Sequence, residues 1–159
     1  SANYVSFSFC ETYSTLSSVE VCTRILKDGT SGVLALAGDN GYPYAVPLSY
    51  VLQDGKIYFH SAKAGHKLDA IRQCAKASFC VIDQDQVVPI AFGVIRILEN
   101  TEEKRSAIEA LAKKYSIEDS PESRNAAIRQ EWNALCMLEM TVEHLSGKEA
   151  IELMKGSPA

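Results

Sequence analysis

The sequence predicts an α+β fold in which a small antiparallel barrel of about six strands is flanked by helices. Short apolar segments with turn-sized gaps fill residues 32–98, and a helical pair follows before one last strand returns. Strands and helices that are segregated along the chain are typical of α+β proteins, whereas a doubly wound fold alternates them. With 159 residues, 47% of them hydrophobic, we expect one domain over residues 1–159 that buries about 70% of its unfolded surface.

The first elements follow from apolar runs and turn residues. Residues 1–18 are expected to form an N-terminal arm, in which the alternation at Val5–Phe9 indicates a short strand. A helix is expected over about residues 19–27, because a serine can cap it and Asp-Gly follows it. The apolar run Gly32–Ala37 lies between glycines and predicts a buried strand, and the Asp-Asn-Gly that follows predicts a turn.

The next strand is predicted over residues 43–52. One face of it is apolar: Tyr44, Val46, Leu48, Tyr50 and Leu52. Pro47 has no N–H group, so it must lie at a sheet edge, a bulge or a strand interruption. Asp54-Gly55 predicts a tight turn into a third strand, Lys56–Ser61.

The remaining elements complete the barrel and its helices. We expect a helix over residues 66–74, strands over 77–83 and 90–98 joined through Val88-Pro89, and helices that begin near Asn100 and Ser120. Residues 135–144 alternate as a strand with one solvated face, on which Glu139, Thr141 and Glu143 point outward. Gly147 is expected to end this strand, and residues 148–155 to form a last short helix.

Composition excludes several classes of function. The net charge of −4 argues against a general nucleic-acid binder, and no apolar run of about 18 residues could cross a membrane. No secretory signal is visible, so we expect a cytoplasmic protein. Five scattered cysteines without a C-x-x-C pair indicate a reducing compartment and packing roles: Cys10, Cys22, Cys74, Cys80 and Cys136. No histidine pair has metal-ligand spacing, so we expect no metal site.

The loop after the third strand is the candidate site. The strand ends in Ser61-Ala62, and Gly65, His66 and Lys67 open the next helix. Helix-start N–H groups and a lysine suit an anion such as a phosphate. The alternative is that Lys67 is an ordinary solvated lysine and that Ser61 only ends a strand. His66 could transfer a proton or contact a substrate, although a lone histidine on a loop is more often polar surface.

Three segments resemble a known family. GYPYAVPLSY, IYFHSA and AGHKLDAIR look like the pyridoxamine 5'-phosphate oxidase-like split-barrel flavoproteins, and most closely the nitroimidazole-resistance branch. The match is good over residues 32–83 and looser elsewhere. The resemblance implies a split barrel with FMN at a homodimer interface. It implies flavin phosphate near Ser61, Ala62 and Lys67, and the isoalloxazine ring near Val46, Pro47 and Leu48.

Function follows from the resemblance rather than from composition. It implies an FMN-dependent oxidoreductase acting on a small molecule, with a nitroaromatic compound as one candidate and His66 as the candidate catalytic residue. Two alternatives stay open. One is a flavin- or haem-binding protein of the same fold without turnover, and the other is a dimeric scaffold.

Overall fold

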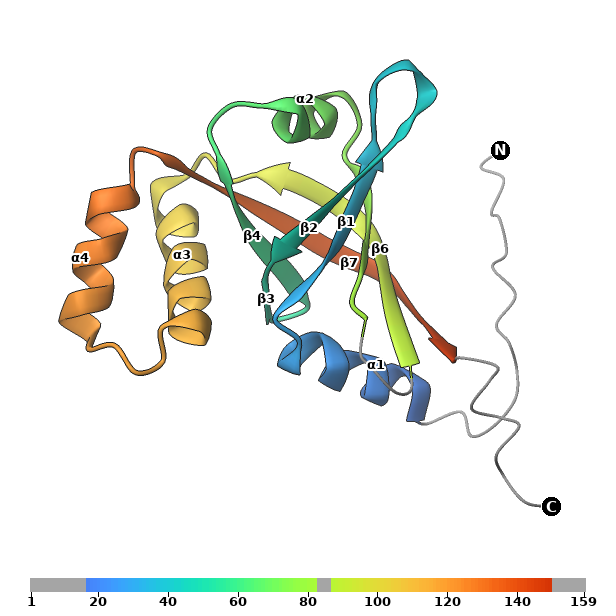
Figure 1. Ribbon diagram of the computed structural model, residues 1–159, viewed down its shortest axis with the longest axis horizontal. Coiled ribbons are helices and arrows are strands. Elements are labelled where there is room, and N and C mark those ends of the chain that lie inside the picture. The colour runs from blue at the N-terminus through green and yellow to red at the C-terminus, as the bar shows by residue number, and fades with distance from the viewer. Residues whose placement is uncertain (1–16, 83–86, 150–159) are drawn as a thin grey trace.

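A curled antiparallel sheet with helices around it forms the protein in the computed structural model (Figure 1), which describes residues 17–82 and 87–149. The helices are α1 (Ser17–Asp28), α2 (His66–Gln73), α3 (Thr101–Tyr115) and α4 (Pro121–Glu131). The strands are β1 (Ser31–Ala37), β2 (Pro43–Ser49), β3 (Val51–Gln53), β4 (Lys56–Ala62), β5 (Lys76–Cys80), β6 (Val87–Ile97) and β7 (Leu135–Glu149). The sheet order is β2-β1-β5-β6-β7-β4-β3. The predicted α+β barrel is confirmed.

The stretch predicted as one strand over residues 43–52 forms two strands instead. It is interrupted at Tyr50, so β2 lies at one edge of the sheet and β3 at the other. Because of this break the barrel is open on one side. The described chain therefore has seven strands, whereas the sequence predicted about six. Pro47 lies in the edge strand β2, opposite Val33 of β1, as its missing N–H group requires.

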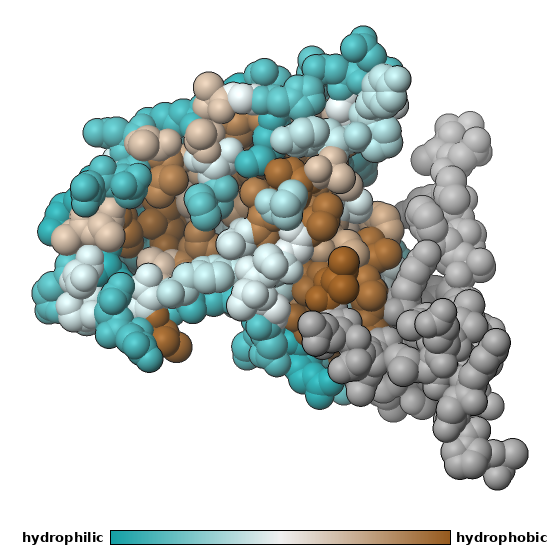
Figure 2. Space-filling view, viewed as in Figure 1, coloured by the Kyte–Doolittle hydropathy of each residue, from teal (hydrophilic) through white to brown (hydrophobic). Residues whose placement is uncertain are grey.

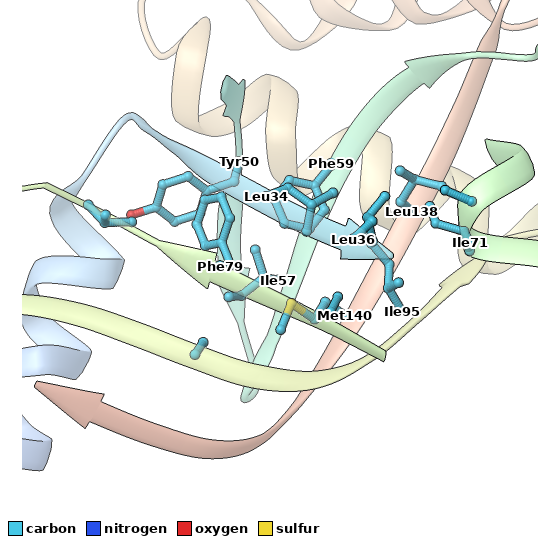
Figure 3. Close-up of a cluster of buried hydrophobic side chains, with 14 of the residues drawn as sticks. Leu34, Leu36, Tyr50, Ile57, Phe59, Ile71, Phe79, Ile95, Leu138 and Met140 are labelled. Carbon is cyan, nitrogen blue, oxygen red and sulfur yellow. The ribbon is translucent and has the colours of Figure 1, made fainter. Parts of the chain in front are cut away.

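Three aromatic rings anchor the core inside the curled sheet (Figure 3). Tyr50, Phe59 and Phe79 are fully buried. The Phe79 ring centroid lies 4.8 Å from that of Tyr50 and 5.0 Å from that of Phe59, both in edge-to-face geometry. The Tyr50 hydroxyl donates to the carbonyl of Leu26 in α1 at 2.5 Å, so its polar end is satisfied within the core. The residue at which the predicted strand is interrupted, Tyr50, therefore contributes its aromatic ring to the core.

The helical pair α3–α4 covers the outer face of the sheet over β7 and β4. A second apolar cluster forms there: Leu98, Ala107, Ile108, Ile128 and Met137. The prediction that one face of β7 is solvated is therefore wrong at Glu139, because this residue points outward but is only 5% exposed. Thr141 and Glu143, farther along β7, are exposed as predicted.

The end of β7 differs from the sequence-based expectation. The strand runs through Gly147 to Glu149, and it pairs with β6 as far as Val87. The predicted break at Gly147 and a helix beginning at Lys148 are therefore wrong. Val88 and Pro89, predicted as a connection, lie inside β6 because β7 supplies pairing partners for them. The arm at residues 1–16, with its predicted strand and Cys10, and residues 150–159 lie outside the described residues.

A β-bulge bends the long β6–β7 pair. The register shifts between Phe92 and Gly93. A Cβ atom on Gly93 would lie 1.9 Å from the Thr141 carbonyl oxygen, so only glycine allows the two strands to approach this closely. Bulges increase local twist and curvature, which helps this sheet curl.

Candidate functional site

The residues of the predicted anion site lie where β4 ends and α2 begins. Ser61 lies opposite Cys136 of β7, and the Ser61 side chain faces the inside of the curled sheet with the residue 7% exposed. Ala62 follows and is exposed. Gly65 has a φ of 132°, which lets the chain reverse direction before α2 starts at His66. The first turn of α2 therefore lies next to the end of β4.

Lys67 in that first turn reaches back to the strand. Its ammonium Nζ donates to the Ser61 hydroxyl oxygen at 3.3 Å. Burial lowers the pKa of Lys67, and Cys136 raises it to a smaller extent. Within the described part of the chain Lys67 forms no ion pair with a carboxylate. A half-buried cation whose one hydrogen-bond partner among the described residues is a hydroxyl group would be stabilised by a bound anion.

His66 contacts the hairpin between β1 and β2. Its Nδ1 lies 3.3 Å from the Asp39 carboxylate, and its ring packs edge-on against Tyr44 with centroids 4.8 Å apart. The His66 side chain is 43% exposed, so a small molecule could reach it. Tyr44 lies on the same face of β2 as Val46 and Leu48, so His66 stands at one end of the predicted ring-binding segment.

The three predicted ring contacts do not share a face. Val46 and Leu48 are half-buried and pack against the core, whereas Pro47 is exposed on the opposite face. What they share is the backbone of an edge strand, and an edge strand leaves N–H and C=O groups unpaired. The β2 strand also approaches β4 across the open side of the barrel. The structure thus brings the predicted ring-binding segment of β2 close to the strand that carries Ser61.

Burial raises the pKa of the Cys136 thiol, and two lysines that the sequence analysis did not single out, Lys63 and Lys104, act to lower it. Cys136 pairs with Ser61 in the sheet. Lys63 directly follows β4, where it could have been noticed as a neighbour of Ser61. Lys104 comes from the first turn of α3, and its Nζ donates to the Trp132 carbonyl at 2.8 Å while lying 4.4 Å from the Trp132 ring centroid. No local pattern links Lys104 to this site, because the contact depends on how α3 packs.

Other features of the described residues lie elsewhere or offer no site. A hollow of about 320 Å³ between β3 and α3 contains none of the predicted site residues. No three His, Cys, Asp or Glu side chains of the described ranges are grouped to hold a metal ion. None of the helices found in residues 17–149 is both long and apolar enough to cross a membrane.

Comparison with known proteins gives the family of this chain. The profile of the family described as pyridoxamine 5'-phosphate oxidase matches residues 18–149. This chain belongs to the pyridoxamine 5'-phosphate oxidase family. The match includes β2, β4 and α2, which carry the candidate site, and the predicted resemblance is confirmed. A search of curated proteins gives no match to this chain.

Solved structures support the family fold. A conserved hypothetical protein from Mycobacterium tuberculosis is 20% identical with a TM-score of 0.74, over 93% of this chain and 91% of that one. A protein from Bacteroides thetaiotaomicron assigned to 5-nitroimidazole antibiotic resistance is 17% identical with a TM-score of 0.65, over 80% and 81%. The FAD and haem binding protein of Mycobacterium smegmatis is 19% identical with a TM-score of 0.68, over 90% and 80%. At these identities the likeness establishes the split-barrel fold of the pyridoxamine 5'-phosphate oxidase family.

Proposed function

We propose that this protein is a flavin-dependent oxidoreductase that holds FMN with its phosphate against Ser61 and Lys67. The contact between the half-buried Lys67 ammonium and the Ser61 hydroxyl carries this proposal. A phosphate would accept charge-assisted hydrogen bonds from Lys67 and a hydrogen bond from Ser61. The start of α2 adds backbone N–H groups that favour an anion.

The comparisons support a flavin as the cofactor class. The family described as pyridoxamine 5'-phosphate oxidase covers the candidate site, and the Mycobacterium smegmatis relative is described as binding FAD. FMN is the smallest flavin that supplies the phosphate this site suits. The free edge of β2 at Val46, Pro47 and Leu48 would supply backbone groups to the ring edge.

When bound, the flavin supplies the electron transfer, so the residues of the chain bind, orient and move protons. Lys67 and Ser61 would hold the phosphate end, and the β2 edge would orient the ring. His66 lies beside Tyr44 at the end of that edge, with its Nδ1 turned to Asp39. Its Nε2 is then the atom that would give a proton to a small oxidised substrate, for which a nitroaromatic compound is our candidate.

A homodimer completes the proposal. The outer face of the sheet carries apolar side chains that the register aligns across strands: Val33, Ala35, Pro47, Cys80, Ile90 and Val94. Figure 2 shows brown, apolar surface over the strands in the middle of the view, between the hydrophilic surfaces of the β1–β2 hairpin and α2 above and of α1 below. An apolar sheet face of this kind suits a second copy of the chain.

Stopped-flow reoxidation tests the chemistry. The FMN-loaded, reduced protein is mixed with a panel of nitro compounds and quinones. Loss of a proton donor typically costs roughly 10²–10⁴-fold in rate, so His66→Ala should slow reoxidation while FMN stays bound. His60→Ala is the matched control, because His60 is exposed on the opposite face of β4 from Ser61.

Two outcomes would change the proposal. If His66→Ala matches the parent across the panel, the histidine has no catalytic role. If no acceptor reoxidises the flavin faster than dissolved oxygen does, a flavin- or haem-binding protein without turnover becomes the better account.

A further inference from the structure

The turn between β1 and β2 places a carboxylate against His66. Asp39 opens this turn, and its carbonyl accepts from the Tyr42 N–H at 3.0 Å. The Gly38 N–H donates to the Tyr42 carbonyl at 3.0 Å, and Asn40 takes a positive φ of 57°, which asparagine tolerates. These backbone features determine where the Asp39 side chain leaves the turn. In Figure 1 the β1–β2 hairpin lies beside α2 at the top of the view.

The His66 ring is held from two sides. Its Nδ1 lies 3.3 Å from an Asp39 carboxylate oxygen. Its ring meets that of Tyr44 edge-on, with 4.8 Å between the centroids and 75° between the ring planes. Tyr44 packs against the core, so it supports the imidazole from a fixed place. Both the position and the rotation of the imidazole are therefore set by its neighbours.

The carboxylate also decides which nitrogen of His66 is free. An ionised carboxylate only accepts hydrogen bonds, so it favours a proton on the nitrogen that faces it, which is Nδ1. Within residues 17–82 and 87–149, Nε2 has no hydrogen-bond or ion-pair partner. The side chain is 43% exposed. Nε2 is therefore the nitrogen that is left for a substrate.

We infer that Asp39 is a positioning residue for His66, because its carboxylate holds the imidazole with Nε2 toward the substrate. This inference rests on the proposed function, in which His66 gives a proton to that substrate. The imidazolium loses its Nε2 proton to the substrate, keeps its Nδ1 proton toward Asp39, and then regains a proton from water. Asp39 stays ionised throughout and acts only through His66. The Asp-Asn-Gly segment, which the sequence predicts only as a turn, would then also serve the site.

Reoxidation of the reduced, FMN-loaded protein by nitro compounds tests this role. Asp39→Asn keeps the shape of the side chain and suits the same turn, but it removes the charge. We expect this variant to slow reoxidation roughly tenfold at unchanged FMN affinity, because misplacing a reacting group lowers the rate. Asp69→Asn is the matched control, since Asp69 is an exposed carboxylate of α2 that pairs with Arg72 at 3.5 Å, and it should match the parent.

A double-variant cycle separates positioning from a general disturbance of the hairpin. In a His66→Ala background, Asp39→Asn should have no further effect on the reoxidation rate, because Asp39 has no imidazole left to hold. If Asp39→Asn slows the reaction equally with and without His66, the aspartate acts elsewhere and this inference is overturned.

The tautomer of His66 gives a readout that needs no flavin. At alkaline pH, where imidazoles are neutral, nitrogen-15 NMR of the apoprotein tells which ring nitrogen carries the proton. His66→Ala assigns the signal among the three histidines of the chain. We expect the proton on Nδ1 in the parent and in Asp69→Asn, and a smaller share of this form in Asp39→Asn.

The remaining outcomes distinguish this inference from the proposed function. A proton on Nε2 in the neutral His66 of the parent would overturn the inference alone. So would an Asp39→Asn rate equal to that of the parent while His66→Ala is slow. If His66→Ala matches the parent, the histidine and Asp39 both lose their roles. A parent that binds no flavin, or whose flavin no acceptor reoxidises faster than oxygen does, would overturn the proposed function and this inference with it.

Discussion

Arg96 of β6 donates from its Nε to the buried Glu139 of β7 at 2.9 Å, and its two terminal nitrogens reach Glu103 of α3 at 3.2 and 3.0 Å. Glu139 also accepts from the Tyr58 hydroxyl at 3.1 Å and lies 3.6 Å from the Lys56 ammonium. One arginine thus connects two central strands with the helix that covers them. A buried carboxylate needs such partners because desolvation without them is costly.

Replacing Arg96 should destabilise the protein strongly. Arg96→Met leaves the Glu139 carboxylate, whose side chain is 6% exposed, without its closest cation. We expect the free energy of unfolding to fall by about 3 kcal/mol, measured by urea denaturation. Arg129→Met, at an exposed arginine of α4, is the control and should change it by less than about 0.5 kcal/mol. Arg96→Met/Glu139→Gln should be more stable than Arg96→Met, and a double variant that is less stable would show that the lost charge pairing is not the cause.

Alkaline pH should weaken the same network. Burial, and secondarily the Glu139 charge, raise the pKa of Tyr58 to about 12, whereas an unfolded tyrosine titrates near 10. Between these values the folded state keeps a proton that the unfolded state loses, so stability falls as pH rises. Chemical denaturation at several pH values should show a shallower decline for Tyr58→Phe than for the parent. Tyr42→Phe, at a residue 75% exposed, should follow the parent. Identical slopes for Tyr58→Phe and the parent would contradict this.

The bulge in the β6–β7 pair should not tolerate a side chain. In Gly93→Ala the new methyl group would meet the Thr141 carbonyl oxygen at 1.9 Å, so the two strands would have to separate. We expect a loss of about 2 kcal/mol or more in the free energy of unfolding. Thermal unfolding followed by circular dichroism measures it. A melting temperature equal to that of the parent would mean that the strands are farther apart than described.

The proposed dimer should depend on the outer face of the sheet. Val33 lies between Pro47 and Cys80 on that face, so Val33→Lys would place a charge in the apolar contact. Sedimentation velocity at micromolar concentration should show a dimer for the parent and a monomer for Val33→Lys. Ile117→Lys, at a residue 79% exposed between α3 and α4, should remain dimeric. A monomeric parent would remove the homodimer from the account.

Local patterns predicted most elements, because alternation, turn residues and caps act over short distances. Asp54-Gly55 predicted the turn between β3 and β4, and both residues have positive φ there. The errors concern partners that are distant in sequence. Glu139 is buried because α3 covers it, and Gly147 stays in a strand because β6 pairs beside it. Likewise, the sequence put Ser61 and Lys67, which are six residues apart, in one candidate site, whereas the contact of Lys104 with Trp132 depends on the packing of α3.

The comparison of FMN with riboflavin tests the central claim most directly, because the two ligands differ only in the phosphate. Isothermal titration of the apoprotein should give an affinity for FMN at least roughly tenfold higher than for riboflavin, since the phosphate gains charge-assisted hydrogen bonds. Lys67→Gln should remove that difference, and Lys113→Gln should preserve it. Equal affinities for FMN and riboflavin in the parent, or a preference for FMN that survives in Lys67→Gln, would contradict a phosphate site at Ser61 and Lys67.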